Sequence, residues 1–171
     1  QYKGDRVIIY TNTIDRVEKL CRYLCRQGFK AEFYHGKCED KPARLERFAS
    51  GKVKVMVATN AFGLGVNIPD IRLVIHHAPL IGLEEAGRAG RDGKKSTALL
   101  LWHEYDFTIN FRLIKENQME LKGAELKERL HALEALHDYA CENHKCRWGM
   151  IREFFGEKPG KRCKKRCDNC K

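Results

Sequence analysis

Three kinds of segment are missing from these 171 residues. No run approaches the roughly 20 apolar residues that cross a bilayer, so we expect no membrane partner. No Gly-x-x-x-x-Gly-Lys-Ser/Thr loop occurs. The stretch Gly93-Lys94-Lys95-Ser96 does not complete one, because the first glycine of the loop would fall at position 88, which is arginine. No Asp-Glu-x-His/Asp box for Mg²⁺ occurs either. P-loop ATPases hold their phosphates and metal with those motifs, so we expect this chain alone not to hydrolyse ATP.

Positive charge and clustered cysteine are what the composition has in excess. The 33 Lys+Arg against 23 Asp+Glu give a net charge of +10, which suits a nucleic-acid partner but equally a merely basic protein. Half of the 8 cysteines fall between Cys146 and Lys171. Such crowding favours metal binding in a reducing cell over disulfides. We therefore expect an intracellular protein, in the nucleus of a eukaryote or the cytoplasm of a bacterium.

Apolar runs alternate with amphipathic stretches over the first part of the chain. We expect strands at 6–10, 31–34, 53–58, 73–76 and 98–102 and helices at 13–27 and 42–49. This alternation predicts an α/β fold with a mainly parallel sheet. From about Tyr105 the pattern is helical, at 107–117, 121–141 and 147–155. We place a domain boundary there, giving 1–104 and 105–171. The chain opens at Gln1 almost directly on a strand, so we expect a piece of a longer protein.

Two segments between residues 57 and 93 carry phosphate-binding signals. The first, 57–70, leaves a strand and enters a glycine-containing turn, where ligands of α/β sheets bind. The second, 84–93, holds Arg88 and Arg91, whose spacing places them on one side of a helical turn. Guanidinium groups match phosphate oxygens, and one aimed at a γ-phosphate stabilises the transition state. Solvated surface arginines are the alternative, which the three bracketing glycines disfavour.

Four cysteines near the end of the chain have the spacing of a metal site. They are Cys146, Cys163, Cys167 and Cys170. A closed set of four thiolates is typical of structural zinc, with free thiols or a disulfide as alternatives. Cys141 and His144 are the nearest competing ligands. We interpret Cys141 as a packing residue, because it continues a leucine-rich helix.

Together these motifs resemble the RecQ family of superfamily 2 helicases. Gly87-Arg88-Ala89-Gly90-Arg91-Asp92-Gly93 is similar to motif VI. Residues 57–79 resemble motif V, 8–13 motif IV, and Tyr34-His35-Gly36 the segment between them. The cysteine series with Phe154-Phe155-Gly156-Glu157 resembles the family's zinc module, although the gap from Cys163 to Cys167 is longer than usual. Glu84-Glu85 stands where the family usually has Gln-Glu, and 79–87 and 35–48 are shorter than usual.

The resemblance implies a second RecA-like motor lobe over 1–104 and a helical zinc-binding module over 105–171. The longer protein would be an ATP-dependent 3′→5′ DNA helicase of repair and recombination, acting on single strands and duplex junctions. ATP and Mg²⁺ would be bound mainly by a first RecA-like lobe, which this chain lacks.

The resemblance also assigns roles to single residues. Arg91 would be the arginine finger and Arg88 its companion on phosphate. Gly65 and Asn67 would lie near the nucleotide. The DNA-backbone contacts would come from Asn12, Thr13, Thr59 and Asn60.

Two other functions remain open. A non-catalytic DNA-binding or scaffold module could keep the lobe fold without using ATP, but we would expect it to lose the two arginines. An RNA helicase of the same superfamily is the second alternative, and the zinc module argues against it.

Overall fold

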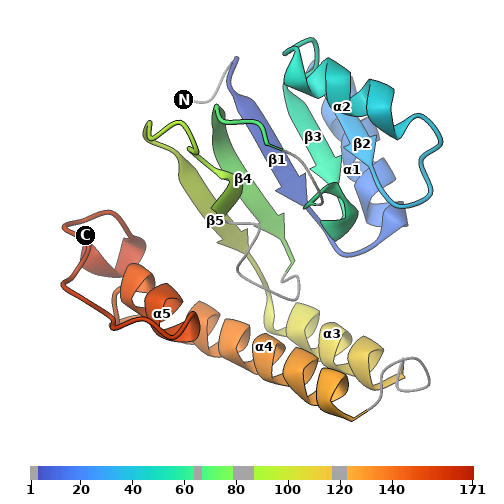
Figure 1. Ribbon diagram of the computed structural model, residues 1–171. Coiled ribbons are helices and arrows are strands. Elements are labelled where there is room, and N and C mark those ends of the chain that lie inside the picture. Colours follow the sequence, from blue (N-terminus) through green and yellow to red (C-terminus); the bar gives the residue numbers. More distant parts are fainter. Residues whose placement is uncertain (1–3, 64–66, 79–86, 117–122) are drawn as a thin grey trace. The chain divides into compact units, whose positions relative to one another are not determined.

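The computed structural model describes residues 4–63, 67–78, 87–116 and 123–171 (Figure 1). The chain divides into two compact units, which are described separately. The sheet unit comprises residues 1–80 and 84–106, and the helical unit comprises 81–83 and 107–171. Among the described residues, no helix is long and apolar enough to cross a membrane.

Five parallel strands form the sheet of the first unit, in the order β2-β3-β1-β4-β5. They are β1 (Arg6–Tyr10), β2 (Ala31–Tyr34), β3 (Val55–Ala58), β4 (Ile71–His77) and β5 (Thr97–Leu101). Helix α1 (Ile14–Arg26) joins β1 to β2, helix α2 (Lys41–Ala49) joins β2 to β3, and the 3₁₀ turn η1 (Asn60–Gly63) follows β3. The prediction of an α/β fold with a parallel sheet is confirmed.

Both faces of the sheet are apolar, as parallel sheets require when helices cover each face. Successive residues of a strand point to opposite faces, so β1 contributes to two cores. On one face α1 packs on a cluster made of Val7, Ile9, Val17, Cys21, Val55 and Val57. Helix α2 and η1 lie on the other face (Figure 1). They pack on a larger cluster whose fully buried members include Ile8, Tyr10, Phe48, Met56, Phe62 and Val74.

The helical unit contains α4 (Ala124–Cys141), α5 (Arg147–Phe154), the 3₁₀ turn η4 (Asp168–Cys170) and most of α3 (Glu104–Glu116). Among its described residues the buried side chains lie on α3 and α4 and are Phe107, Asn110, Ile114, Leu133, Leu136 and Ala140. The Phe107 ring meets the His137 ring edge-on, with centroids 4.7 Å apart. No residue from 142 to 171 is buried.

Helix α3 begins three residues before the predicted start at 107 because its first turn is capped. The backbone N–H of His103 donates to Asp106 Oδ2 at 2.9 Å, and the N–H of Tyr105 donates to His103 Nδ1 at 3.2 Å. This reciprocal pattern is that of a capping box, with histidine in place of the usual serine or threonine. The substitution hides the cap from a search for the usual capping residues.

Candidate nucleic-acid, nucleotide and zinc sites

The four residues predicted to contact DNA follow two strands at the same end of the sheet. Strands β1 and β3 are paired in register at Tyr10 and Ala58, so the residues that follow them emerge side by side. The Thr11 N–H donates to the Ala58 carbonyl at 3.0 Å, which continues this pairing beyond the strands. The four side chains are half-buried or exposed, namely Asn12, Thr13, Thr59 and Asn60. The fold therefore gathers two separate motifs at the carboxyl edge of the sheet.

One cation at this edge was not expected from the sequence. Arg16 Nη1 donates to Asn12 Oδ1 at 3.3 Å, and the Arg16 N–H donates to Thr13 Oγ1 at 3.3 Å. Thr13 is thus the N-cap of α1, and Arg16 brings positive charge to the two polar residues. The signal in the sequence was the four-residue spacing from Asn12, which is weak without the fold.

The candidate nucleotide contacts lie at the other end of the sheet. The Gly90 N–H donates to the carbonyl of Ile71, the first residue of β4, at 2.9 Å, and the Asp92 N–H donates to the Pro69 carbonyl at 3.1 Å. Arg91 Nη1 donates to Asn67 Oδ1 at 3.4 Å. The structure therefore brings these two candidates together, at the amino end of β4. Gly65 lies outside the described residues.

The two motif-VI arginines do not share one helical turn, contrary to the expectation from their spacing. Arg88 lies in a short 3₁₀ turn, and Gly90 then adopts a φ of +69°. A Cβ at Gly90 would lie 2.8 Å from the Lys94 carbonyl oxygen, so both the dihedral angle and the space demand glycine. Arg88 is half-buried, and its Nε has no hydrogen-bond partner among the described residues. A buried donor of this kind calls for an acceptor.

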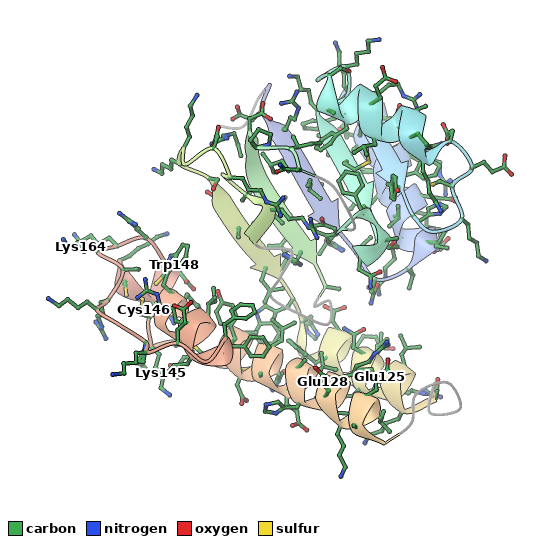
Figure 2. All side chains as sticks on the ribbon, viewed as in Figure 1. Glu125, Glu128, Lys145, Cys146, Trp148 and Lys164 are labelled. Atoms are coloured by element: carbon green, nitrogen blue, oxygen red, sulfur yellow. The ribbon has the colours of Figure 1, made fainter. Side chains whose placement is uncertain are left out.

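The four cysteines predicted as metal ligands come together in the helical unit. Their sulfur atoms all lie within 4.8 Å of one another, and Cys163 and Cys167 are 3.4 Å apart. Sulfurs about 3.8 Å apart surround a tetrahedral zinc ion, so the set fits that metal. Cys146 precedes α5, with Lys145, Trp148 and Lys164 around it (Figure 2). With four sulfurs and no open position, such a site is structural.

The thiols of this cluster respond to their surroundings in opposite directions. Partial loss of contact with water raises the pKa of Cys170 to about 12, together with hydrogen bonds among the thiols. At Cys146 partial desolvation also acts to raise the pKa. Hydrogen bonds from the backbone N–H groups of Gly149 and Cys163 and from neighbouring thiols outweigh it and bring the pKa to about 6. Cys146 is therefore more ready than Cys163 or Cys170 to lose its proton to a metal.

Polar contacts hold the cysteine-bearing loop against the end of α4. Arg147 donates to the Tyr139 carbonyl and pairs with Asp168 at 3.0 Å. Asn169 Nδ2 donates to the carbonyls of Glu142 and Lys145 at 3.0 and 2.9 Å. These contacts flank Cys167 and Cys170 and help to place these two ligands beside the end of α4.

The interpretation of Cys141 as a packing residue is wrong. The side chain is exposed, and its sulfur lies 3.6 Å from His137 Nε2. The apolar stripe of α4 runs through Leu133, Leu136 and Ala140, so the next position is turned by roughly 100° away from it. Neither Cys141 nor His144 belongs to the four-sulfur cluster.

The spacer between Cys163 and Cys167 contains an unusual backbone. Lys164 and Lys165 have φ values of 50° and 64°, in the left-handed region that residues with a Cβ seldom adopt. The chain thus makes room for three spacer residues by coiling left-handed through two of them.

A parallel sheet with a glycine–arginine turn, followed by a four-cysteine helical unit, defines a two-part chain, and comparisons with known proteins match both parts. The helicase conserved C-terminal domain matches residues 1–93, and the RecQ zinc-binding domain matches residues 104–171. The chain belongs to the RecQ family of helicases.

Similar curated proteins are much longer. The ATP-dependent DNA helicase RecQ of Bacillus subtilis is 36% identical over 169 residues, which cover 95% of this chain and 28% of the relative. ATP-dependent DNA helicase Q1 of Pongo abelii is 34% identical over 99% of this chain and 26% of its own length. A putative ATP-dependent RNA helicase, R290 of Acanthamoeba polyphaga mimivirus, is 35% identical over 99% and 31%.

Solved structures support the RecA-like helicase fold of the lobe. A DEAD box protein from Methanococcus jannaschii aligns with a TM-score of 0.55 at 25% identity, over 70% of this chain and 34% of that one. The Escherichia coli DEAD-box protein SrmB aligns with a TM-score of 0.54 at 24% identity, over 71% and 73%.

Proposed function

We propose that this chain is the second motor lobe and zinc module of an ATP-dependent DNA helicase that moves 3′→5′ along one strand and unwinds duplex DNA. The observation that carries the proposal is the pairing of Arg91 with Asn67 at the amino end of β4, beside an unpartnered buried nitrogen of Arg88. A guanidinium with a free donor at a glycine turn suits a phosphate oxygen.

In the proposed mechanism, ATP binds between a first lobe and this one. Water attacks the γ-phosphorus, the bond to the bridging oxygen breaks, and negative charge spreads over the γ-oxygens. Arg91 stabilises that charge, and Arg88 holds a phosphate oxygen through its Nε. The pair leaves the phosphates when inorganic phosphate departs, which changes the lobe's orientation on DNA. The chain alone, without motifs for ATP and Mg²⁺, would be inactive.

DNA would be held at the carboxyl edge of the sheet. Asn12, Thr13, Thr59 and Asn60 offer short polar side chains that reach phosphate oxygens, and Arg16 adds charge beside them. These contacts carry no base identity, which suits a motor that must move along any sequence. We keep the boundary between the lobe and the module at residue 104, and we expect the protein in the nucleus or bacterial cytoplasm.

Zinc would be held by Cys146, Cys163, Cys167 and Cys170 and would supply folding energy rather than chemistry. The surrounding lysines and arginines would favour DNA phosphates in a salt-dependent manner.

The test is DNA-stimulated ATP hydrolysis by the longer protein, wild type against Arg91→Ala. We expect kcat to fall by about 10³-fold or more while ATP and DNA binding survive. Arg22→Ala is the matched control, because Arg22 is an exposed arginine that pairs with Glu18 on the same helix, α1. Normal hydrolysis by Arg91→Ala would refute the role of Arg91, and an inactive wild-type protein would favour a scaffold module.

A second candidate, an RNA helicase, is favoured by one observation. The mimivirus relative is named as a putative RNA helicase and is similar over nearly the whole chain. Stimulating the ATPase with matched single strands of DNA and RNA separates the two, and stronger stimulation by RNA would replace DNA as the substrate.

A further inference from the structure

Arg72, on β4, joins the two segments that carry the candidate nucleotide contacts. Its Nε donates to the Asp70 carbonyl at 3.2 Å, its Nη1 to the Lys95 carbonyl at 3.2 Å, and its Nη2 to the Pro69 carbonyl at 3.5 Å. Nη2 also pairs with Asp92 Oδ2 at 2.6 Å. One side chain therefore ties the residues before β4 to the turn that follows Arg91.

The side chains of the pair between Arg72 and Asp92 are partly shielded from water. The two side chains are 14% and 20% exposed, which distinguishes them from the exposed pairs on the helices. Asp92 Oδ1 meanwhile accepts from the Lys94 N–H at 3.1 Å, so this carboxylate holds its own turn as well. Charge-assisted contacts of this kind are short and strong, so they restrict the geometry of the groups that they join.

Arg91 lies between the points that this network fixes. Its neighbour Gly90 is bound to Ile71, and its other neighbour Asp92 is bound both to Pro69 through the backbone and to Arg72 through the side chain. The direction in which the Arg91 side chain leaves the backbone is set by these contacts. The Arg91 guanidinium itself is exposed and reaches Asn67 with a long 3.4 Å contact.

We propose that Arg72 and Asp92 are a positioning pair, which fixes the turn at 90–93 and thereby aims Arg91 at the γ-phosphate. The inference rests on the proposed function of Arg91 and extends it to two residues that touch no substrate. Lysine cannot replace Arg72, because an ammonium is a single point and cannot reach three carbonyls and a carboxylate in different directions.

The experiment measures DNA-stimulated ATP hydrolysis by the longer protein with Arg72→Lys, Arg91→Ala and both changes together. We expect Arg72→Lys to lower kcat by about 10- to 100-fold, the effect of a misplacement of about 1 Å, with KM for ATP within about 2-fold. In the Arg91→Ala background, Arg72→Lys should have no further effect on kcat, because the residue it positions is gone.

Arg47→Lys is the matched control. Arg47 pairs with Glu32 at 2.5 Å through Nε and at 3.1 Å through Nη2, on α2 and β2 and away from Arg91. It should leave kcat unchanged while it lowers the melting temperature about as much as Arg72→Lys does. If Arg72→Lys fails to fold, Asp92→Asn, which keeps the side-chain shape, replaces it. It is then measured alone and together with Arg91→Ala.

The outcomes separate the two proposals. If Arg91→Ala lowers kcat but Arg72→Lys and Asp92→Asn do not, the positioning role is wrong and the role of Arg91 stands. If the effects of Arg72→Lys and Arg91→Ala multiply, Arg72 acts by another route and the inference is overturned. If Arg91→Ala has no effect, the proposed function fails first.

Discussion

The sheet unit buries apolar side chains on both faces of its sheet, whereas residues 142–171 of the helical unit bury none. Ile8, Met56 and Val57 are fully shielded from water, and no cation is needed to hold them. In residues 142–171, polar contacts to the end of α4 and four converging sulfur atoms take the place of an apolar core. The stability of the sheet unit should therefore depend on the packing of apolar side chains, and that of residues 142–171 on metal binding.

Removing zinc should have the largest effect and should divide the two units. Structural zinc contributes about 10–16 kcal/mol of binding free energy in small zinc domains, and residues 142–171 have no buried side chain to replace it. We expect chelation, or Cys167→Ser, to remove amide-exchange protection from 142–171 while β1 and β3 keep theirs. Protection of 142–171 that survives in the metal-free chain would show that polar contacts alone suffice.

Truncating Phe48 should have the next largest effect, and in the opposite unit. Phe48 is fully buried and meets the Phe62 ring edge-on, with centroids 5.8 Å apart. We expect Phe48→Ala to lower the free energy of unfolding of the sheet unit by about 3–5 kcal/mol, with zinc content unchanged. Phe29→Ala is the control, because that ring is 54% exposed and should cost less than about 0.5 kcal/mol. Equal costs would refute this assignment of the core.

Acid should weaken the sheet unit through His76. Burial lowers the pKa of His76 to about 4 from its ordinary 6.5, so the unfolded chain binds the proton more tightly. Stability from this group is complete above about pH 6.5 and is lost as the pH falls toward 4, by about 2 kcal/mol between pH 7 and 5. His76→Phe, which keeps a ring beside Tyr10, should remove that part of the pH dependence. The measurement is the free energy of unfolding from urea titrations at pH 7 and pH 5. An equal loss between these pH values in the wild type and the variant would contradict the prediction.

Relieving the left-handed spacer should give the smallest effect. Glycine adopts the φ of 64° at Lys165 without steric cost, so Lys165→Gly should stabilise the metal-bound loop by about 1 kcal/mol. Lys161→Gly controls for the lost charge, because it lies outside the left-handed positions of the loop. The measurement is the zinc concentration needed for half-maximal protection of the loop, and a weaker affinity for Lys165→Gly would count against strain.

The fold could be predicted from the sequence because the spacing of apolar residues that marks strands and helices lies within short stretches of the chain. The runs at 6–10 and 31–34 become β1 and β2 with the predicted limits, since buried parallel strands are short apolar runs. The third strand starts later than predicted, at Val55, and β4 extends beyond its prediction on both sides, to Ile71 and His77. Those limits depend on pairing with neighbouring strands, which local sequence does not encode.

The candidate sites were predictable in residue type but not in arrangement. The four cysteines converge as predicted, because their spacing and chemistry admit few alternatives. The roles of Arg88 and Arg91 remain predictions, and the contacts of Arg72 with the turn at 90–95 were not foreseen. An arginine inside a strand pattern gives no sign that its guanidinium serves a loop 20 residues away.

Three neighbouring parallel strands, β1, β3 and β4, separate the arginine turn from the polar edge formed by Asn12 and Thr59. A parallel strand rises about 3.3 Å per residue, so the five residues of β1 hold the two ends roughly 16 Å apart. Strand β1 pairs regularly with β3 and, from Val7 onward, with β4, and the sheet is packed on both sides, so this part of the lobe should resist bending. If one end of these strands tilts toward a partner, the other end turns through the same angle. The distance it moves grows with its distance from the axis of rotation.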